Sequence, residues 1–406
     1  MASWSDLPSD MLGLVIARLP FPADRARFRA VCRAWHSALR RHVAAAPQLP
    51  WIVLPDGTFV TVSNGRGGVH RMPFPGSNAI CVGSTDGWLA LHRTDVDGAG
   101  TTRTRHTFLL HNPFTSATVP LAELGDILDD VFFEEFHVRK VIVRPGGPDG
   151  GGHLVAVMTD HWDCPLILCR PGKGTWTPEP CTMPFVRVID IAFFQDKLYL
   201  IIKSTDLFAI DLADDEHGAP TVTNVERIIR HPRSHNSRFR WSDTEDDDAV
   251  ADDDDGEGFR WSCTDYRIEE GDNAVDAIIT TWNLVESRGG ALLMVRREWL
   301  VAGLTPTEYT RKVDVFEADM DGGGGGAWVP VITGGLGGQA IFQSEVFCKS
   351  VPAPARAHDE MEEDVLYFVD TQDVWDMRSG ARKPFKGRPR VYELGMTWLF
   401  PPELVV

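Results

Sequence analysis

The chain has 406 residues, of which 43% are apolar, so it can bury a sizeable core and wholesale disorder is excluded. Its net charge of −18 at pH 7 argues against a general nucleic-acid binder, which would present a basic face. No apolar stretch approaches the roughly 18 residues of a membrane-spanning helix, so we expect no membrane partner. The length predicts two or three domains, or one small module joined to a large one.

Residues 1–46 predict a small all-α module of three short helices, followed by a linker at residues 47–50. Pro8 suits the first position of a helix, and Asp10 then lies in the first turn, where the helix dipole favours an acid. Two apolar series repeat the spacing i, i+3, i+4, i+7: Leu12, Val15, Ile16, Leu19, and Phe28, Val31, Cys32, Trp35. So small a module buries little surface, so part of these stripes is expected to face a partner or the rest of the chain.

The segment WSDLPSDMLGLVIARLPFPADRARFRAVCRAWHSAL resembles an F-box. The matching positions are Leu7, Pro8, Asp10, Leu12, Ile16, Leu19, Asp24, Phe28, Val31, Cys32 and Trp35. The resemblance implies docking on the Skp-type adaptor of SCF-type cullin–RING ubiquitin ligases. One departure is the arginine-rich middle of the segment, where many family members carry more leucine.

Family docking surfaces are apolar and the adaptor is acidic, so both the stripes and the charge of residues 1–46 fit the resemblance. This segment carries seven arginines against three aspartates, a net +4 that would steer association with an acidic partner. The adaptor-binding residues implied in this way are Leu7, Pro8, Leu12, Ile16, Leu19, Val31 and Trp35.

Residues 51–406 lose the helical spacing and show short apolar runs separated by Gly, Asp and Pro, which is typical of many short strands. Three stretches with the pattern strand, tight turn, strand predict hairpins: residues 80–92, 188–202 and 284–297. The sequence DVLYFVD, residues 364–370, is interpreted as the second half of another such unit. The body is therefore expected to be a large all-β domain.

The motif Gly-x-Trp-x-Pro occurs twice, as GTWTP and as GAWVP. Its tryptophans, Trp176 and Trp328, are 152 residues apart (328 − 176), which is near three periods of about 50 residues. This degenerate repetition predicts a β-propeller of six or seven blades, with a tryptophan or another large apolar residue between blades. A pair of two-sheet sandwiches is the alternative architecture.

The body also resembles the C-terminal module of plant F-box proteins known as domain of unknown function 295, regarded as a kelch-like β-propeller. The resemblance rests on GWLALH, HNPFTSATVPL, DKLYLI, NLVESRGGALLMVRR, VDVFEAD with a following Trp, GGQAIF and DVLYFVD, which occur in this order. It covers most of residues 50–400, implies a propeller, and says little about what that propeller binds.

The cysteines suggest free thiols rather than a metal site. There are seven, an odd number, mostly within apolar runs, and no N-glycosylation acceptor or signal-peptide pattern occurs. We therefore expect a reducing compartment, the cytoplasm or the nucleus or both. His161, Cys164, Cys169 and Cys181 lack the paired spacing of a zinc site, and core thiols are expected.

Other candidate sites are weak. The pair His231 and His235 lies in a polar segment without helical support, so a metal is not predicted there. The glycine-rich residues 322–326 and 334–338 lack the Lys-Ser/Thr of a P-loop and are interpreted as flexible loops. No catalytic signature stands out, so we predict no catalytic residue, metal or cofactor.

Two charged segments complete the sequence. Residues 243–257 contain ten acids and no base, which predicts a disordered acidic insert at about residues 232–262, with docking of a basic partner as the alternative. RKPFKGRPR, residues 382–390, is interpreted as an exposed basic loop, with a nuclear-import patch as the alternative.

The favoured hypothesis is a non-catalytic substrate-recognition subunit of an SCF-type ubiquitin ligase. The F-box would dock on the Skp-type adaptor by an apolar helix face, and the propeller would hold an unknown target protein near the ubiquitin carrier. One alternative is a β-propeller enzyme, which would need carboxylates, histidines or a metal at the central channel. Another is an F-box scaffold that acts outside degradation.

Overall fold

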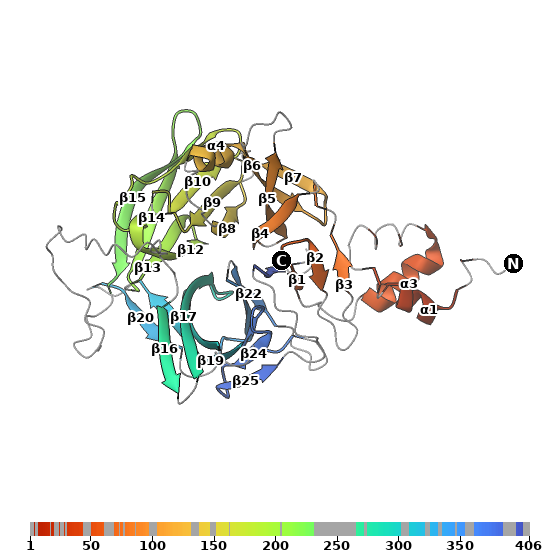
Figure 1. Cartoon of the computed structure of the whole chain (residues 1–406). Coiled ribbons are helices and arrows are strands. Elements are labelled where there is room, and N and C mark those ends of the chain that lie inside the picture. The colour runs from red at the N-terminus through yellow and green to blue at the C-terminus, as the bar shows by residue number, and fades with distance from the viewer. Residues whose placement is uncertain are drawn as a thin grey trace.

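The structure is a computed structural model of the whole chain, and Figure 1 shows how its elements are arranged. It describes residues 4, 7–16, 18–19, 24, 28, 31–43, 50–60, 69–72, 74–75, 78–85, 87–96, 104–130, 138–146, 152–161, 163–203, 205–230, 265–271, 274–301, 308–320, 325–331, 335–345, 347–353, 361–384 and 395–400. The acidic insert predicted at about residues 232–262, the pair His231 and His235, and most of the predicted basic loop lie outside these residues.

The N-terminal module contains helices α1 (Ser9–Ile16) and α3 (Arg33–Val43). Its core consists of the buried side chains Leu12, Ile16, Phe28 and Ala38. Leu12 and Ile16 follow the i, i+4 spacing of one helix face, as predicted. Trp35 of α3 packs against Phe28 with ring centroids 4.4 Å apart, and the two apolar series meet in this core.

The strands of the described residues form six sheets, numbered here as blades in chain order. Blade 1 has the order β26 (Thr397–Leu399), β1 (Trp51–Val53), β2 (Thr58–Val60), β3 (Val69–Arg71). Blade 2 consists of β4 (Ala79–Thr85), β5 (Trp88–Val96), β6 (Thr104–Asn112) and β7 (Ala117–Pro120). Blade 3 consists of β8 (Val138–Arg144), β9 (Leu154–Thr159), β10 (Leu166–Arg170) and β11 (Gly174–Trp176).

The other three blades follow in the second half of the chain. Blade 4 consists of β12 (Val188–Phe194), β13 (Lys197–Ile202), β14 (Leu207–Asp214) and β15 (Pro220–Ile229). Blade 5 consists of β16 (Asp265–Gly271), β17 (Ala274–Glu286), β18 (Leu292–Val301), β19 (Glu308–Asp319) and β20 (Ala327–Pro330). Blade 6 has the order β22 (Cys348–Pro352), β21 (Gln339–Gln343), β23 (Val365–Phe368), β24 (Asp373–Asp376), β25 (Ala381–Pro384). Helix α4 (Ala122–Asp130) connects blades 2 and 3, and the 3₁₀ turn η2 (Phe185–Arg187) connects blades 3 and 4.

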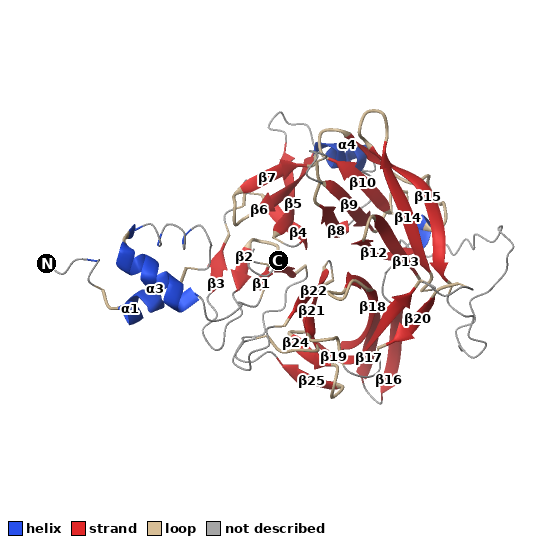
Figure 2. Ribbon diagram, turned by 180° about the vertical axis from the view of Figure 1, so that it is seen from behind, coloured by secondary structure: helices blue, strands red, loops and turns tan. Residues whose placement is uncertain are grey.

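The six blades surround a common centre, as Figures 1 and 2 both show. The strands β26, β4, β8, β12, β17 and β22 each contact the next one in this order, so they are the inner strands. The ring is closed within blade 1, where β26 from the C-terminal part pairs antiparallel with β1, placing Trp51 opposite Leu399. The predicted β-propeller is confirmed with six blades, and the sandwich alternative is excluded.

The core lies between the blades. Six clusters of buried apolar residues each join one blade to the next: blades 1 and 2, 2 and 3, 3 and 4, 4 and 5, 5 and 6, and 6 and 1. Successive side chains of a strand point to opposite faces, so one strand serves two clusters. In β1, Trp51 and Val53 face blade 2 whereas Ile52 faces blade 6. This is why the propeller strands are buried on both faces.

The three predicted hairpins are confirmed. They are β4–β5, β12–β13 and β17–β18, each an antiparallel pair in one blade. The Gly-x-Trp-x-Pro motifs form the outermost strands β11 and β20. Trp176 packs between blades 3 and 4, and Trp328 packs between blades 4 and 5. The 152 residues between them span two blades rather than three, because residues 231–264 add length between β15 and β16.

The segment DVLYFVD was assigned to the wrong half of its hairpin. β23 is the first strand of an antiparallel hairpin with β24, which places Leu366 opposite Trp375. Its other neighbour, β21, runs parallel to it, with Ile341 opposite Leu366. All four residues of β23 are buried, so the run carries no alternation that would indicate its partners.

The second glycine-rich segment is a hydrogen-bonded turn where the structure describes it. Gly335, Gly337 and Gly338 have φ of +75°, +73° and +77°, a conformation that favours glycine. The buried Asp364 carboxylate accepts hydrogen bonds from the backbone N–H of Leu336 (2.5 Å) and of Gly338 (3.0 Å). The interpretation as a flexible loop is therefore corrected for these residues.

Candidate functional site

Besides Trp4, the N-terminal module carries four exposed apolar side chains, which we call the module face. They are Met11 (52% exposed), Leu14 (42%), Val15 (37%) and Val31 (57%). Met11, Leu14 and Val15 follow the spacing i, i+3, i+4 and so lie on one side of α1. Clustered exposed apolar side chains mark interaction sites, so the module face is the candidate docking surface.

The residues predicted to bind an adaptor occupy three different environments. Pro8 and Val31 are exposed. Leu7, Leu19 and Trp35 are half-buried against the core of the module. Leu12 and Ile16 lie within that core, with 1% and 3% of their surface exposed, so they hold the shape of the module and offer almost no surface. The adaptor contacts of all seven stay a prediction.

Sequence reasoning missed Met11 and Leu14. The stripe through Leu12 and Ile16 was assumed to be the docking side, and it is the side that packs on α3 and Phe28. The available signal was that α1, SDMLGLVI, is apolar around most of its circumference. Such a pattern is typical of a helix that is buried on more than one side.

The centre of the propeller holds a buried ion pair between Lys140 and Asp190, here called the hub pair. Lys140 Nζ lies 2.7 Å and 2.9 Å from the two carboxylate oxygens of Asp190, and both side chains are almost fully buried. Asp190 also accepts a hydrogen bond from the backbone N–H of Leu284 (2.5 Å). One carboxylate therefore joins the inner strands of blades 3, 4 and 5.

Register shifts in two inner strands determine where the hub pair lies. Lys140 on β8 and Asp190 on β12 each follow a register shift, with Arg139 and Ile189 as the extra residues. A β-bulge changes the direction in which the following side chain points. Bulges are common where a strand makes a specific contact. Local backbone geometry thus turns two charged groups toward each other between neighbouring blades.

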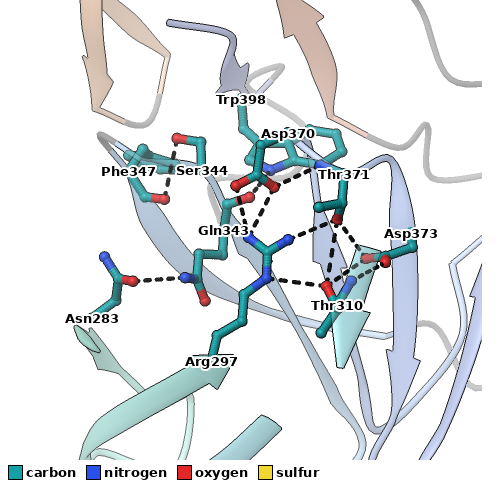
Figure 3. Close-up of polar contacts among 10 residues, drawn as sticks. All are labelled: Asn283, Arg297, Thr310, Gln343, Ser344, Phe347, Asp370, Thr371, Asp373 and Trp398. Atoms are coloured by element: carbon teal, nitrogen blue, oxygen red, sulfur yellow. Dashed lines mark hydrogen bonds and ion pairs between the residues drawn. The ribbon is translucent and has the colours of Figure 1, made fainter. Parts of the chain in front are cut away.

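Arg297 holds blade 5 to blade 6, as Figure 3 shows. Its guanidinium donates to both carboxylate oxygens of Asp370 (2.9 and 2.7 Å) and to Thr371 Oγ1 (2.7 Å). Its Nε donates to Thr310 Oγ1 (3.1 Å), and the group lies 3.9 Å from the centre of the Phe368 ring. Charge, hydrogen bonding and ring stacking are all satisfied within the protein, which indicates a structural role.

A second set of polar contacts in Figure 3 continues from blade 5 to blade 1. Gln343 Nε2 donates to Asn283 Oδ1 (2.6 Å), which joins blade 6 to blade 5. Trp398 Nε1 donates to the backbone carbonyl of Gln343 (2.9 Å), which joins blade 1 to blade 6. These contacts, like the hub pair, connect blades near the centre of the ring.

Cys81, Cys164 and Cys169 are buried and Cys348 is half-buried, whereas Cys181 is exposed, so the expectation of a core thiol is wrong for Cys181. Burial raises the pKa of Cys164 to about 11, and it raises the pKa of Cys81, Cys169 and Cys348 to about 12. A nucleophile or a metal ligand has to be a thiolate, so these groups are poorly suited to either role near neutral pH. His161 Nδ1 lies 3.8 Å from Cys164 Sγ, and the described residues contain no group of three or more potential metal ligands.

A histidine pair in blade 2 makes stability depend on pH. His92 Nε2 lies 2.8 Å from His106 Nδ1, and the His92 ring stacks on Phe108 at 4.6 Å. Burial, together with the smaller effect of the nearby His106, lowers the pKa of His92 to about 4. Below its ordinary pKa of about 6.5, the unfolded chain binds a proton at this residue that the folded chain does not.

We therefore expect the protein to lose about 1–2 kcal/mol of unfolding free energy through His92 between pH 7 and pH 5. Stability is fully present above the unfolded pKa and falls as the pH drops toward the folded pKa. Urea unfolding at both pH values should show this loss, and His92→Phe should reduce it. The exposed His217 gives the matched control, since His217→Gln should leave the pH dependence unchanged. A His92→Phe profile identical to that of the parent would contradict the assignment.

Within the described residues, no helix is both long and apolar enough to span a membrane.

Comparison with known proteins gives matches to both parts of the chain. The F-box domain model matches residues 4–43, and the KIB1-4 beta-propeller model matches residues 59–392. Among similar Arabidopsis thaliana proteins, the probable F-box protein At4g22060 is 23% identical over 53% of this chain and 57% of its own length. F-box protein At1g10110 is 27% identical over 57% of this chain and 60% of its own length. The chain thus spans less than two thirds of these relatives.

Proposed function

Because the chain belongs to the KIB1-4 β-propeller family and carries an N-terminal F-box domain, we propose that it is the substrate-recognition subunit of an SCF-type ubiquitin ligase. The F-box would bind the Skp-type adaptor, and the propeller would bind a target protein. The observation that carries the proposal is the module face, an exposed apolar surface on a module whose core is already filled.

The adaptor would meet the module face directly. Met11, Leu14 and Val15 would enter an apolar groove of the partner, in the manner of an amphipathic helix. The exposed Arg18, Arg33 and Arg41 border α1 and α3 and would attract an acidic partner. Leu12 and Ile16 would support this surface from within the module.

The chain itself would do no covalent chemistry. Its contribution would be proximity, since a target held by the propeller is presented to the charged ubiquitin carrier of the ligase. The polar networks of the propeller support this division of roles, because the hub pair and the Arg297 contacts are internally satisfied. We propose the cytoplasm or the nucleus as the place of action.

The first test is adaptor binding by the whole chain and by a chain that starts at Pro50. We expect purified Skp-type adaptor to bind the former and not the latter. Binding by both would overturn the F-box assignment, and so would binding by neither when both are folded. Target turnover in cells then separates a degradative subunit from a scaffold.

A sharper test changes only the module face. The double variant Met11→Asp with Val31→Asp should weaken adaptor binding by about 10- to 100-fold, because each change places a charge in an apolar contact. Calorimetric titration measures this loss. The control is Val69→Asp on β3, an exposed valine (70%) outside the module, which should bind normally.

Variants of the buried residues answer a different question. Aspartate at Leu12 or Ile16 would place a charge in the core and unfold the module, so lost binding there does not separate contact from folding. The module-face variant must therefore keep its helical circular dichroism. Unchanged adaptor affinity in that folded variant would show that Met11 and Val31 are not contact residues.

A further inference from the structure

The outermost strand of blade 4 differs from those of the other blades. β15 has ten residues, whereas the outermost strands β3, β7, β11, β20 and β25 have three or four. Figures 1 and 2 both place β15 at the periphery of the ring. A long edge strand presents unpaired backbone N–H and C=O groups, which is a template for another strand.

The middle of β15 is open to solvent. Five consecutive residues, 223–227, are exposed, and in the described part of the chain only Ile229 pairs beyond β14, with Gly326 of blade 5. Most edge strands avoid pairing by being short, and β15 does not have this protection. Its outward edge is therefore available for a partner at residues 223–227.

Two register shifts define which part of the edge is regular. They lie between Leu207 and Phe208 and between Asp211 and Leu212 of β14, and the four β15 residues between them, Asn224 to Arg227, pair in an unbroken ladder. Bulges disturb pairing at the ends of such a stretch. An added strand would therefore be in register with about four residues, and would meet Val225 on one face and Glu226 on the other.

The surroundings of β15 are acidic. Residues 207–229 carry five acids against one arginine: Asp211, Asp214, Asp215, Glu216 and Glu226 against Arg227. Lys197 pairs with Asp211, and Arg170 pairs with Asp214. Arg227 pairs with Asp206 from the neighbouring loop. Among the described residues, Asp215, Glu216 and Glu226 form no salt bridge with a lysine or an arginine, although Lys173 lies beside Gly218 in the β14–β15 turn. The remaining excess of carboxylates favours a basic partner.

We propose that β15 binds an extended, lysine- or arginine-rich segment of a partner protein by strand addition. Backbone hydrogen bonds along Asn224 to Arg227 would supply affinity, Val225 (37% exposed) would supply an apolar contact, and the acids would supply selectivity for basic segments. That the partner is a ubiquitination target rests on the proposed function. Strand addition itself does not, and a lysine-rich segment would also carry acceptor groups.

The first experiment tests the edge with adjacent proline variants of the full chain, Val225→Pro and Glu226→Pro. Neighbouring N–H groups of a strand point to opposite edges, so one variant breaks the ladder to β14 and the other removes an outward donor. Urea unfolding identifies the second, because it keeps a stability near that of the parent. The probe is a short fluorescent peptide of alternating lysine and valine. We expect the stable variant to bind it at least about tenfold more weakly.

The second experiment tests charge. The lysine peptide should bind the parent about tenfold more tightly at low salt than the same peptide with glutamate in place of lysine. The ratio of the two affinities should be smaller at high salt. Glu226→Lys should reduce that ratio, whereas Glu317→Lys, an exposed glutamate on β19 of blade 5, should not. Equal binding of both peptides, no binding at millimolar peptide, or full binding by the stable proline variant would each overturn the proposal.

Adaptor binding by the same variants separates the two proposals. Loss of peptide binding with normal adaptor binding supports a separate partner site on β15. Normal peptide binding without adaptor binding would overturn the proposed ligase role and leave strand addition at β15 intact.

Discussion

Replacing Asp190 by asparagine is expected to lower the free energy of unfolding by about 3–5 kcal/mol. The substitution keeps the size of the side chain and an acceptor for the N–H of Leu284, but it removes the charge that faces Lys140. Lys140 is only 3% exposed and cannot reach water, so its ammonium would remain buried without compensation. Urea unfolding followed by tryptophan fluorescence measures the loss, since the chain has 13 tryptophans.

The double variant Lys140→Met with Asp190→Asn tests the cause. It removes both charges, so we expect it to recover most of the stability lost in Asp190→Asn, in keeping with the behaviour of buried ion pairs elsewhere. The exposed pair Lys312 and Asp314 is the control, and Lys312→Met should cost less than about 1 kcal/mol. A double variant as unstable as the single one would show that packing, and not charge, is what Asp190 supplies.

Replacing Arg297 by lysine is expected to cost about 2–4 kcal/mol, although the charge is kept. Lysine cannot bind both oxygens of Asp370 while also reaching Thr310 and Thr371, and it has no planar group to stack on Phe368. Arg297→Met should cost more, because it also leaves Asp370 without its cation. We expect urea unfolding to show that Arg297→Met is the least stable protein, that Arg297→Lys is more stable, and that the parent is the most stable.

The neighbouring residue provides a matched control for Arg297. Arg296 points to the other face of β18, where it is 37% exposed and pairs with Glu298 and Asp314. Arg296→Lys should therefore change stability by less than about 1 kcal/mol. If Arg297→Lys were as stable as Arg296→Lys, the planar guanidinium with its several hydrogen bonds would not matter. Ordinary packing would then explain the burial of Arg297.

Local patterns predicted much of the fold. The spacing of Leu12, Ile16 and Trp35 identified the helical module, and three apolar runs around tight turns identified real hairpins. The resemblance to plant F-box proteins with a C-terminal propeller is confirmed, and the matching propeller family is the KIB1-4 one. These features depend on residues close together in the chain, where periodicity is informative.

Long-range pairing was less predictable. The parallel neighbours β21 and β23 could not be inferred, because a strand buried on both faces has the same pattern whichever way its partner runs. Lys140 and Asp190 are 50 positions apart and carry no local sign that they meet, since most such residues are exposed. The buried side of α1 could not be identified, because both sides of this helix are apolar and sequence alone does not rank them.

The closure of the ring by β26 sets an order of events during synthesis. The helical module ends at Val43, and the strand that completes blade 1 begins at Thr397, 354 residues later (397 − 43). At typical translation rates this interval takes about 20–70 s. For most of this interval, the N-terminal helices are outside the ribosome while blade 1 still lacks its inner strand. A nascent chain therefore presents the module face well before its propeller can close. Under the proposed function, recruitment to the ligase would precede the ability to hold a target.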